Sequence, residues 1–379
     1  MDDARPSKKF ARMKITFRTD ASLTIGTGHV MRCMTLALAL RERGAVCRFI
    51  TRALPGHMAD RIRAEGFGVT LLPAPNGQPS DGPPAHLPWA GVDWRQDASE
   101  ARADMADDSP DWLVIDHYAF DSQWQRAARP EGTKLMVIDD LADRPHACDM
   151  LLDQNFGRIR SDYDSLVSEA CVRLIGPQYA LLRSEFADAR ARTLKTRTRR
   201  NLRHLLVTMG GVDPRDATSL VLQTLSKAIL PKALRITVIM GSNAPALEQV
   251  RTLAKGMPRS TEVAVDVTDM AARMASADLA IGAAGSTTWE RCALGLPTII
   301  VQIADNQAGI AQALSVAGVA LDPGPMQAPD FENNLLALLT KASDHTWLNA
   351  MSEKAAAICD GNGVMRIVKR IGGEVLDEN

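Results

Sequence analysis

A histidine at the start of a predicted helix is the residue of this chain best placed to do chemistry. His29 follows the glycine-rich run 25–28, and residues 30–40 are almost all strong helix formers. Gly26 and Gly28 can adopt positive φ and let a ligand approach the backbone closely. The N-terminal end of a helix carries partial positive charge, which disfavours a protonated histidine at this position. We therefore expect His29 to stay neutral and to serve as a general base. The alternative is a capping or packing histidine in an ordinary strand-to-helix turn.

Polar side chains also follow two predicted strands of the first half. Asp116 and Tyr118 come at the end of one apolar run, and Asp139 comes at the end of the next. Residues just past parallel strands face the ligand in α/β folds, so these three are candidates to orient a sugar or a water. Aspartates at strand ends also cap helices, which is the alternative role.

In the second half, two glycine turns are candidates to bind phosphate. Gly210 and Gly211 end a strand, and Asp213 with the following proline is expected to open the next helix as its N-cap. The second turn is stronger, because backbone N–H groups and hydroxyls at a helix start would accept a diphosphate without a metal. Its residues are Gly285, Ser286, Thr287 and Thr288, followed by Glu290 as a candidate ribose acceptor and, after the next strand, by Asn306 and Gln307. Ordinary helix capping is the alternative for these residues.

Length and composition are those of a globular protein. The chain has 379 residues, 46% hydrophobic and 23% charged, with a net charge of −1. This length favours two domains, and the balanced charge gives no general attraction to nucleic acid or an anionic membrane. No apolar run is long enough to predict membrane insertion. The six cysteines lack CxxC pairing, so we expect buried thiols in a cytoplasmic protein without disulfides or a metal site.

Short apolar runs alternate with helical stretches, which predicts parallel sheets covered by helices. We expect an α/β protein of two doubly wound, Rossmann-like domains facing a central cleft, the first over 13–186 and the second over 204–345. Residues 346–379 are expected to be a C-terminal helical segment, and residues 1–12 a loose extension. The runs that predict strands are 15–17, 46–50, 69–72, 112–115, 135–138, 150–152, 172–175, 204–209, 236–240, 263–265, 279–281 and 298–301.

Two stretches interrupt this alternation. Residues 187–203 hold seven basic side chains and few apolar ones, which predicts a solvated linker, with an anion-binding or RNA patch as the alternative. Residues 73–97 are rich in proline and contain Trp89 and Trp94, which predicts a long loop of functional importance.

Several motifs in combination resemble one family, the nucleotide-sugar hydrolases of pseudaminic acid biosynthesis, from about Met13 to Arg370. The second half alone also resembles the glycosyltransferase that makes lipid II. The motifs are Arg18-x-Asp20 with the run 25–33, Trp89-x-x-Val92-Asp93-Trp94-x-x-Asp97-Ala98, Val114-Ile115-Asp116-His117-Tyr118, Ile138-Asp139-Asp140, Asp153-Gln154-Asn155, Thr208-Met209-Gly210-Gly211-x-Asp213-Pro214 and Gly285-Ser286-Thr287-Thr288-Trp289-Glu290.

The resemblance implies a GT-B fold that holds a uridine nucleotide mainly on the C-terminal domain, with the sugar facing the N-terminal one. It implies hydrolysis of UDP-2,4-diacetamido-2,4,6-trideoxy-β-L-altropyranose at the anomeric carbon, without a metal or cofactor, to supply pseudaminic acid synthesis. The family's catalytic histidine maps onto His29 and its active-site tyrosine onto Tyr118. Our hypothesis is that His29 activates a water opposite UDP, which predicts inversion, while Tyr118 with Asp20 or Asp116 orients the water or sugar. Packing or anion contact is the role expected for Arg32.

The sequence leaves three other functions open: a GT-B glycosyltransferase that uses a UDP-amino sugar, a non-catalytic nucleotide-sugar sensor, and a hydrolase of another diacetamido sugar. In each of these the partner is a small-molecule nucleotide sugar. Neither the oligomeric state nor the aspartate that partners His29 is predicted.

Overall fold

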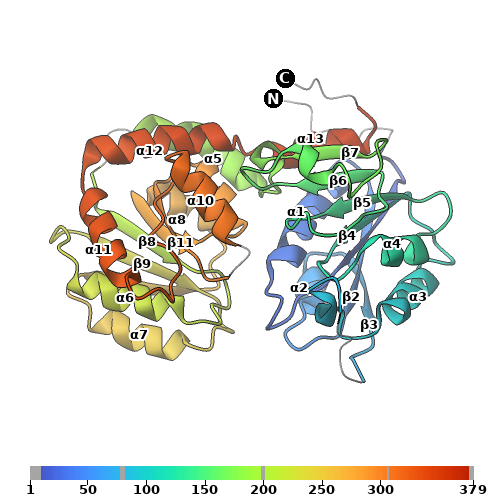
Figure 1. Ribbon diagram of the computed structural model, residues 1–379, viewed down its shortest axis with the longest axis horizontal. Helices are drawn as coiled ribbons and strands as arrows, with labels where there is room; N and C mark the ends of the chain where they lie inside the picture. The colour runs from blue at the N-terminus through green and yellow to red at the C-terminus, as the bar shows by residue number, and fades with distance from the viewer. Residues whose placement is uncertain (1–9, 77–81, 198–200, 305–306, 375–379) are drawn as a thin grey trace. The chain divides into compact units, whose positions relative to one another are not determined.

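The chain divides into two compact units, each built on a parallel sheet (Figure 1). The computed structural model describes residues 10–76, 82–197, 201–304 and 307–374. Unit 1 comprises Met1–Leu181 and Gly363–Asn379, and unit 2 comprises Leu182–Asn362. Every strand expected from the apolar runs is present. Because parallel strands are buried on both faces, continuous apolar runs identified them correctly.

The sheet of unit 1 has the strand order β3-β2-β1-β4-β5-β6-β7. Adjacent residues of each strand point to opposite faces, so Val114 packs with helix α1 while Leu113 and Ile115 pack on the other face. This alternation continues past the strand ends, where the polar residues lie. The strands are β1 Lys14–Thr19, β2 Val46–Arg52, β3 Gly68–Leu72, β4 Trp112–Asp116, β5 Lys134–Ile138, β6 Met150–Asp153 and β7 Val172–Ile175.

Helices cover both faces of this sheet. Helices α1 and α13 pack together on one face, and α3 and α4 pack together on the other. The bounds are α1 Gly28–Glu42, α2 Ala59–Ala64, α3 Trp94–Asp104, α4 Ser122–Ala128 and α13 Gly363–Ile371, with short 3₁₀ helices η1 Leu87–Ala90, η2 Arg160–Tyr163 and η3 Pro177–Tyr179.

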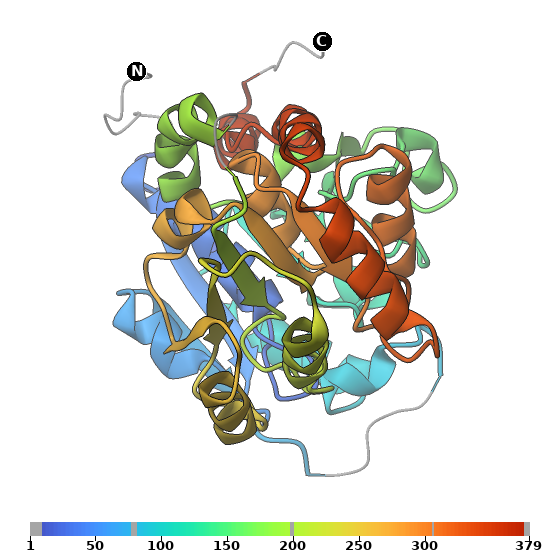
Figure 2. The ribbon, with the colours of Figure 1, turned by 90° about the vertical axis from the view of Figure 1, so that its left-hand side faces the viewer.

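Unit 2 repeats the plan with the strand order β10-β9-β8-β11-β12, and its elements can be followed by their yellow-green to orange-red colours in Figure 2. The strands are β8 His204–Thr208, β9 Arg235–Met240, β10 Ser260–Val265, β11 Leu279–Ala283 and β12 Thr298–Val301. The helices are α5 Ser184–Arg197, α6 Ala217–Lys227, α7 Leu247–Lys255, α8 Met270–Ser276, α9 Thr287–Ala293, α10 Ala308–Val316, α11 Phe331–Lys341 and α12 His345–Ile358.

The expected basic linker is largely a helix of unit 2. Helix α5 occupies Ser184–Arg197, and residues 198–200 lie outside the described residues. Arg190 and Arg197 donate to backbone carbonyls at the ends of neighbouring helices, for example Arg190 to Ala293 at 2.6 Å and Arg197 to Leu294 at 2.8 Å. These two arginines therefore hold helix ends together, which composition alone does not reveal.

Other expected boundaries also differ from the structure. The C-terminal helical segment is divided, with α12 in unit 2 and α13 in unit 1. The expected loop at 73–97 contains η1 and the first turn of α3, while 77–81 lie outside the described residues. Phe10, expected in a loose extension, is only 2% exposed.

Across the described ranges, every helix is too short or too polar to cross a bilayer. The six cysteines are buried, as expected.

A fully buried ion network lies under the α3 face of unit 1. Asp97 receives hydrogen bonds from Arg18 and Arg52, each at 2.6 Å at its shortest, and from the indole of Trp124 at 3.0 Å. These side chains are fully or almost fully inaccessible to solvent. Since a buried charge is stable only when it is paired, Asp97 fixes how α3 and α4 sit on the sheet.

We expect Asp97→Ala to lower the free energy of unfolding by about 3–5 kcal/mol, because two buried guanidinium groups lose their shared carboxylate. Urea denaturation measures this loss. The matched control is Asp108→Ala, which removes an exposed ion pair with Lys14 and should leave the denaturation midpoint nearly unchanged. Equally small effects in both variants would contradict the structural role of Asp97.

Candidate active site

The central contact of the candidate site joins the start of α1 to the end of β4. The Nδ1 atom of His29 lies 2.6 Å from Oδ1 of Asp116. His29 is the second residue of α1, which begins at Gly28, and the turn before it is made possible by Gly26 with φ of 80°. Gly28 has helical rather than positive φ, so only one of the two expected glycine conformations occurs.

Asp116 is an ionised acceptor. Burial alone would raise its pKa, but the charge of Arg32 and the hydrogen bonds from Arg32 and His29 outweigh burial, and the pKa of Asp116 lies well below the ordinary aspartate range. An ionised carboxylate can only accept hydrogen bonds, so the proton of a neutral His29 ring lies on Nδ1 and the lone pair on Nε2. The side chain of His29 keeps 10% of its surface exposed. This is the arrangement of a general base held by a carboxylate.

Arg32, one turn along α1, connects Asp116 to the next strand end. Its guanidinium donates to both carboxylate oxygens of Asp116, at 2.5 and 2.7 Å, and contacts Asp140 at 2.8 Å. Tyr118 donates its hydroxyl to the same Asp140 oxygen at 2.6 Å. Burial and the Asp140 charge raise the pKa of Tyr118 well above its usual value, so it remains a phenol. Arg32 therefore holds the carboxylates of Asp116 and Asp140 in fixed positions.

Aromatic rings surround this polar cluster. The ring of Tyr118 meets the imidazole of His29 edge-on with centroids 4.6 Å apart, and Trp89 of η1 stacks on Tyr118 at 5.5 Å. His86 lies against both Trp89 and Tyr118. The sequence placed Trp89 in a loop of expected functional importance without predicting these contacts, and it gave no chemical role to His86. Flat apolar faces beside a polar cluster are suited to cover one side of a sugar ring.

Two expected site residues point to the opposite face of the sheet. Asp20 is fully buried, and its carboxylate contacts Arg18 at 2.7 Å and His117 at 3.3 Å. Asp139 is also fully buried and accepts from Tyr163 at 2.8 Å. The alternation of side chains along a strand explains both placements. Asp20 lies two residues after Arg18 and Asp139 two residues after Val137, so each points to the same face as that residue. Asp140, the next residue, contacts Arg32 and Tyr118 on the α1 face.

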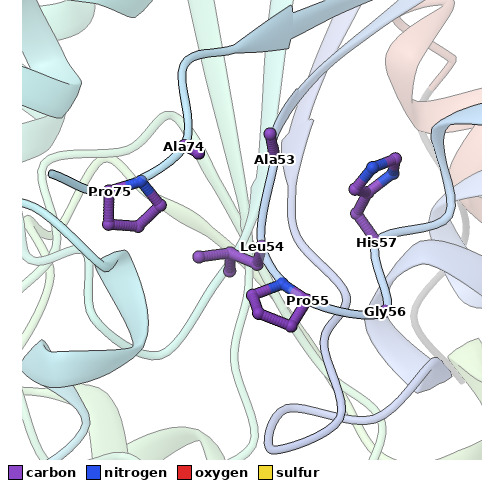
Figure 3. A pocket seen from close by; sticks show the side chains of 7 residues that line it. All are labelled: Ala53, Leu54, Pro55, Gly56, His57, Ala74 and Pro75. Atoms are coloured by element: carbon purple, nitrogen blue, oxygen red, sulfur yellow. The ribbon is translucent and has the colours of Figure 1, made fainter.

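An open pocket of about 550 Å³ lies at the carboxyl ends of the strands of the unit 1 sheet, the edge at which Asp116 and Asp140 also lie (Figure 3). Its walls are the segments that follow β2 and β3, residues 53–57 and 74–75. The first wall is tied to the turn before α1, because Leu23 donates its N–H to the carbonyl of Pro55 at 2.9 Å. Within the described ranges, no group of three or more His, Cys, Asp or Glu side chains could hold a metal ion.

In unit 2, the two glycine turns expected to bind phosphate lie next to each other. Gly210 follows β8 and has φ of 95°, while Gly285 follows β11. Strands β8 and β11 are neighbours in the sheet, with Thr208 paired to Gly282. A Cβ atom built on Gly210 or Gly285 would meet nothing within 4 Å. The carboxyl edge of this sheet therefore presents two adjacent stretches of open backbone, which suits an anionic ligand.

The other residues expected to bind the nucleotide have partners of their own. Asp213 is buried and accepts from the N–H groups of Ala217 and Thr218 at 3.0 and 2.9 Å, while the N-cap of α6 is Asp216 rather than Asp213. Gln307 accepts from the N–H of Ile303 at 2.9 Å. Gly211 accepts from the N–H of Gly241 at 2.9 Å. Asn306 lies outside the described residues.

Glu290 lies one turn into α9 in a largely buried environment. Its side chain is 16% exposed and contacts Arg183 at 3.7 Å. Burial raises the pKa of Glu290 to about 7, because the charges of Arg183 and Arg291 offset only part of the desolvation. Glu290 is therefore poised to change between a neutral acid and an acceptor-only carboxylate near neutral pH.

We expect the free-energy difference between the native protein and Asp116→Asn to depend on pH. Because the pKa of Asp116 is lowered by folding, its stabilising effect is fully present above the ordinary aspartate value of about 3.9 and is lost as the pH falls through its lower folded value. The two proteins should therefore differ most above about pH 5 and converge in acid. Denaturation curves measured at several pH values test this, and a difference that grows in acid would contradict it.

Comparison with known proteins agrees with this architecture. Residues 204–363 match the glycosyltransferase family 28 C-terminal domain. The chain is 28% identical over 244 residues to the UDP-2,4-diacetamido-2,4,6-trideoxy-beta-L-altropyranose hydrolase of Campylobacter jejuni, covering 64% of this chain and 75% of that protein. It is 28% identical over 193 residues to the spore coat polysaccharide biosynthesis protein SpsG of Bacillus subtilis, covering 51% of this chain and 56% of that protein.

Among solved structures, MurG of Acinetobacter baumannii superimposes with a TM-score of 0.68 at 17% identity, over 96% of this chain and 99% of that one. The expected GT-B fold, two Rossmann-like α/β units, is thereby confirmed. The similarities together support an enzyme of the GT-B type that acts on nucleotide sugars.

Proposed function

We propose that this protein hydrolyses UDP-2,4-diacetamido-2,4,6-trideoxy-β-L-altropyranose at the anomeric carbon with inversion. The products are UDP and 2,4-diacetamido-2,4,6-trideoxy-L-altrose, the free sugar that pseudaminic acid synthesis requires. The observation that carries the proposal is the 2.6 Å contact between His29 and Asp116 in a chain similar to the Campylobacter hydrolase. Because Nδ1 of His29 is bound to Asp116, Nε2 is available to accept a proton from water.

In this mechanism Nε2 of His29 removes a proton from a water molecule on the face of the sugar opposite UDP. The water oxygen forms a bond to C1 as the bond from C1 to the diphosphate oxygen breaks, and that electron pair leaves with UDP. Asp116 holds the ring of His29 and stabilises the imidazolium that forms, while Tyr118 orients the sugar or the water. Attack opposite the leaving group inverts C1.

In the proposed mechanism, unit 2 binds the nucleotide part of the substrate. The turns at Gly210–Gly211 and Gly285–Thr288 bind the diphosphate, and Glu290 accepts hydrogen bonds from the ribose hydroxyls. Donors fixed in advance around a developing negative charge stabilise the transition state, often more than any other single effect. The adjacency of β8 and β11 supports a joint role of the two turns.

A second candidate is a GT-B glycosyltransferase that uses a UDP-amino sugar. The match of residues 204–363 to the glycosyltransferase family 28 C-terminal domain favours it. Both candidates bind a UDP-sugar and break the same bond, so they differ in the group that receives the sugar. A hydrolase turns over in water alone.

The deciding experiment incubates the purified protein and EDTA with UDP-2,4-diacetamido-2,4,6-trideoxy-β-L-altropyranose and follows the anomeric signals by proton NMR. We expect free sugar and UDP, with the inverted anomer formed first. Intact substrate that nevertheless protects the protein against thermal unfolding would reject hydrolysis and favour a transferase without its acceptor or a sensor.

We expect His29→Asn to lower the hydrolysis rate by about 10²–10⁴, the usual contribution of a general base, with little change in UDP affinity. Initial rates and isothermal titration calorimetry measure the two quantities. The control is His345→Asn, at the start of α12 in unit 2, which should keep the native rate. A loss of less than about tenfold with intact binding would exclude the assigned role of His29.

We expect the contribution of Glu290 to UDP affinity to appear as the pH rises through about 7, where its carboxyl group ionises and can accept from the ribose. The affinity ratio of the native protein to Glu290→Gln should exceed about tenfold at pH 8, the effect of a hydrogen bond to a charged group, and approach one at pH 6. The titration of UDP itself cancels in this ratio. A ratio that does not vary with pH would argue against the ribose contact.

A further inference from the structure

Arg291 is a buried cation that makes no ion pair within the described residues, although the charge of the neighbouring Glu290 acts on it. It is 1% exposed, and its Nε atom is buried without a hydrogen-bond partner in the described part of the chain. Burial lowers its pKa to about 10, which leaves the group charged at neutral pH. The carboxylate of the preceding Glu290 contacts Arg183 instead. A buried charge that makes no ion pair is costly, so a bound ligand with negative charge would stabilise Arg291 further.

Other buried arginines of the protein have their charge compensated. Arg18 and Arg52 share the carboxylate of Asp97. Arg197 donates to three carbonyls at helix ends, those of Met274, Ala277 and Leu294. The half-buried Arg190 likewise donates to the carbonyls of Ala293, Ala356 and Cys359. Helix C-termini carry partial negative charge, so they suit a guanidinium group.

The guanidinium of Arg291 is instead directed at the turn between β11 and α9. Nη1 donates to the hydroxyl oxygen of Thr287 at 3.1 Å, and Nη2 donates to the hydroxyl of Thr288 at 3.0 Å and to the carbonyl of Ala283 at 2.8 Å. Gly282 leaves the room for this group, since a Cβ atom there would lie 2.6 Å from Nη1 of Arg291. Backbone and side chain are thus shaped to hold a cation beneath the turn.

These contacts fix the polarity of the two hydroxyls. A hydroxyl whose oxygen accepts from a guanidinium must direct its own proton elsewhere. Thr288 is buried and lies 3.5 Å from the carbonyl of Ala283, whereas Thr287 is partly exposed beside the exposed Gly285 and Ser286. Thr287 therefore presents a donor outward, and the cation behind it strengthens that donor.

We propose that Arg291 is a positioning residue that makes the Gly285–Thr288 turn selective for the diphosphate of a nucleotide, acting through the hydroxyl of Thr287. The negative charge of the ligand adds to that of Glu290 in compensating the guanidinium group of Arg291. The choice of a nucleoside diphosphate rests on the proposed function, but the selectivity can be measured without any turnover.

The test compares the affinities of UDP and uridine by isothermal titration calorimetry in Arg291→Met and in the native protein. We expect Arg291→Met to weaken UDP binding at least tenfold and to change uridine binding less than twofold, because uridine carries no phosphate. Arg291→Lys should recover part of the UDP affinity. Thr287→Val, which keeps Arg291 in place, should also reduce the preference for UDP over uridine.

The matched control is Arg190→Met, which removes a guanidinium that serves helix ends. It should lower thermal stability and leave the ratio of UDP to uridine affinity at the native value. If Arg291→Met and Thr287→Val weaken both ligands equally, or neither, Arg291 has a structural role and the proposal is wrong. A native protein that binds UDP no better than uridine also overturns it. A native protein that prefers UDP but hydrolyses no UDP-sugar defeats the proposed function and leaves this inference standing.

Discussion

The pairing of one buried carboxylate organises the candidate site of unit 1. Asp116 ends a central strand and is inaccessible to solvent, so it must be compensated from within the fold. Helix α1 supplies both partners, His29 from its first turn and Arg32 from one turn later. The same interaction therefore anchors the helix to the sheet and fixes the orientation of the imidazole. Tyr118 and Asp140 are joined to it through Arg32.

The alternation of side chains along parallel strands separates two polar networks at one sheet edge. Asp116, Tyr118 and Asp140 fall on the α1 face, where they meet His29 and Arg32. Asp20, His117 and Asp139 fall on the opposite face, where arginines and Tyr163 bind them. The first network reaches a partly exposed histidine, and the second is closed. Stability and proposed catalysis thus use neighbouring residues of the same strands.

The two units present different electrostatic surroundings at their strand ends. In unit 1 the buried aspartates are matched by arginines, and a histidine remains at the margin of the cluster. In unit 2 the corresponding edge carries open glycine backbone, threonine hydroxyls and the buried cation of Arg291. The first arrangement suits proton transfer and the second suits an anion. A reaction that removes a proton from water and expels a diphosphate needs both.

The sequence predicted the strands, because buried parallel strands appear as short apolar runs, and its motifs predicted the GT-B fold class through a family resemblance. It did not distinguish Asp139 from Asp140, or Asp20 from Asp116, although counting alternate residues from Phe17, Val114 and Ile138, which share one face of the sheet, would have done so. It missed helix α5 because arginines that bind carbonyls in the interior have the composition of a solvated linker. The contacts of Arg291 depend on long-range packing around Gly282 and have no local signature.

The proposed reaction depends on attack by water at the anomeric carbon of the sugar. The most direct test is turnover of the UDP-sugar in water enriched in ¹⁸O, with mass spectrometry of the released UDP, whose phosphate oxygens do not exchange with water. We expect UDP without the label, because water bonds to C1 and the original bridging oxygen leaves with the diphosphate. Label in UDP would show attack on phosphorus and would contradict attack at C1.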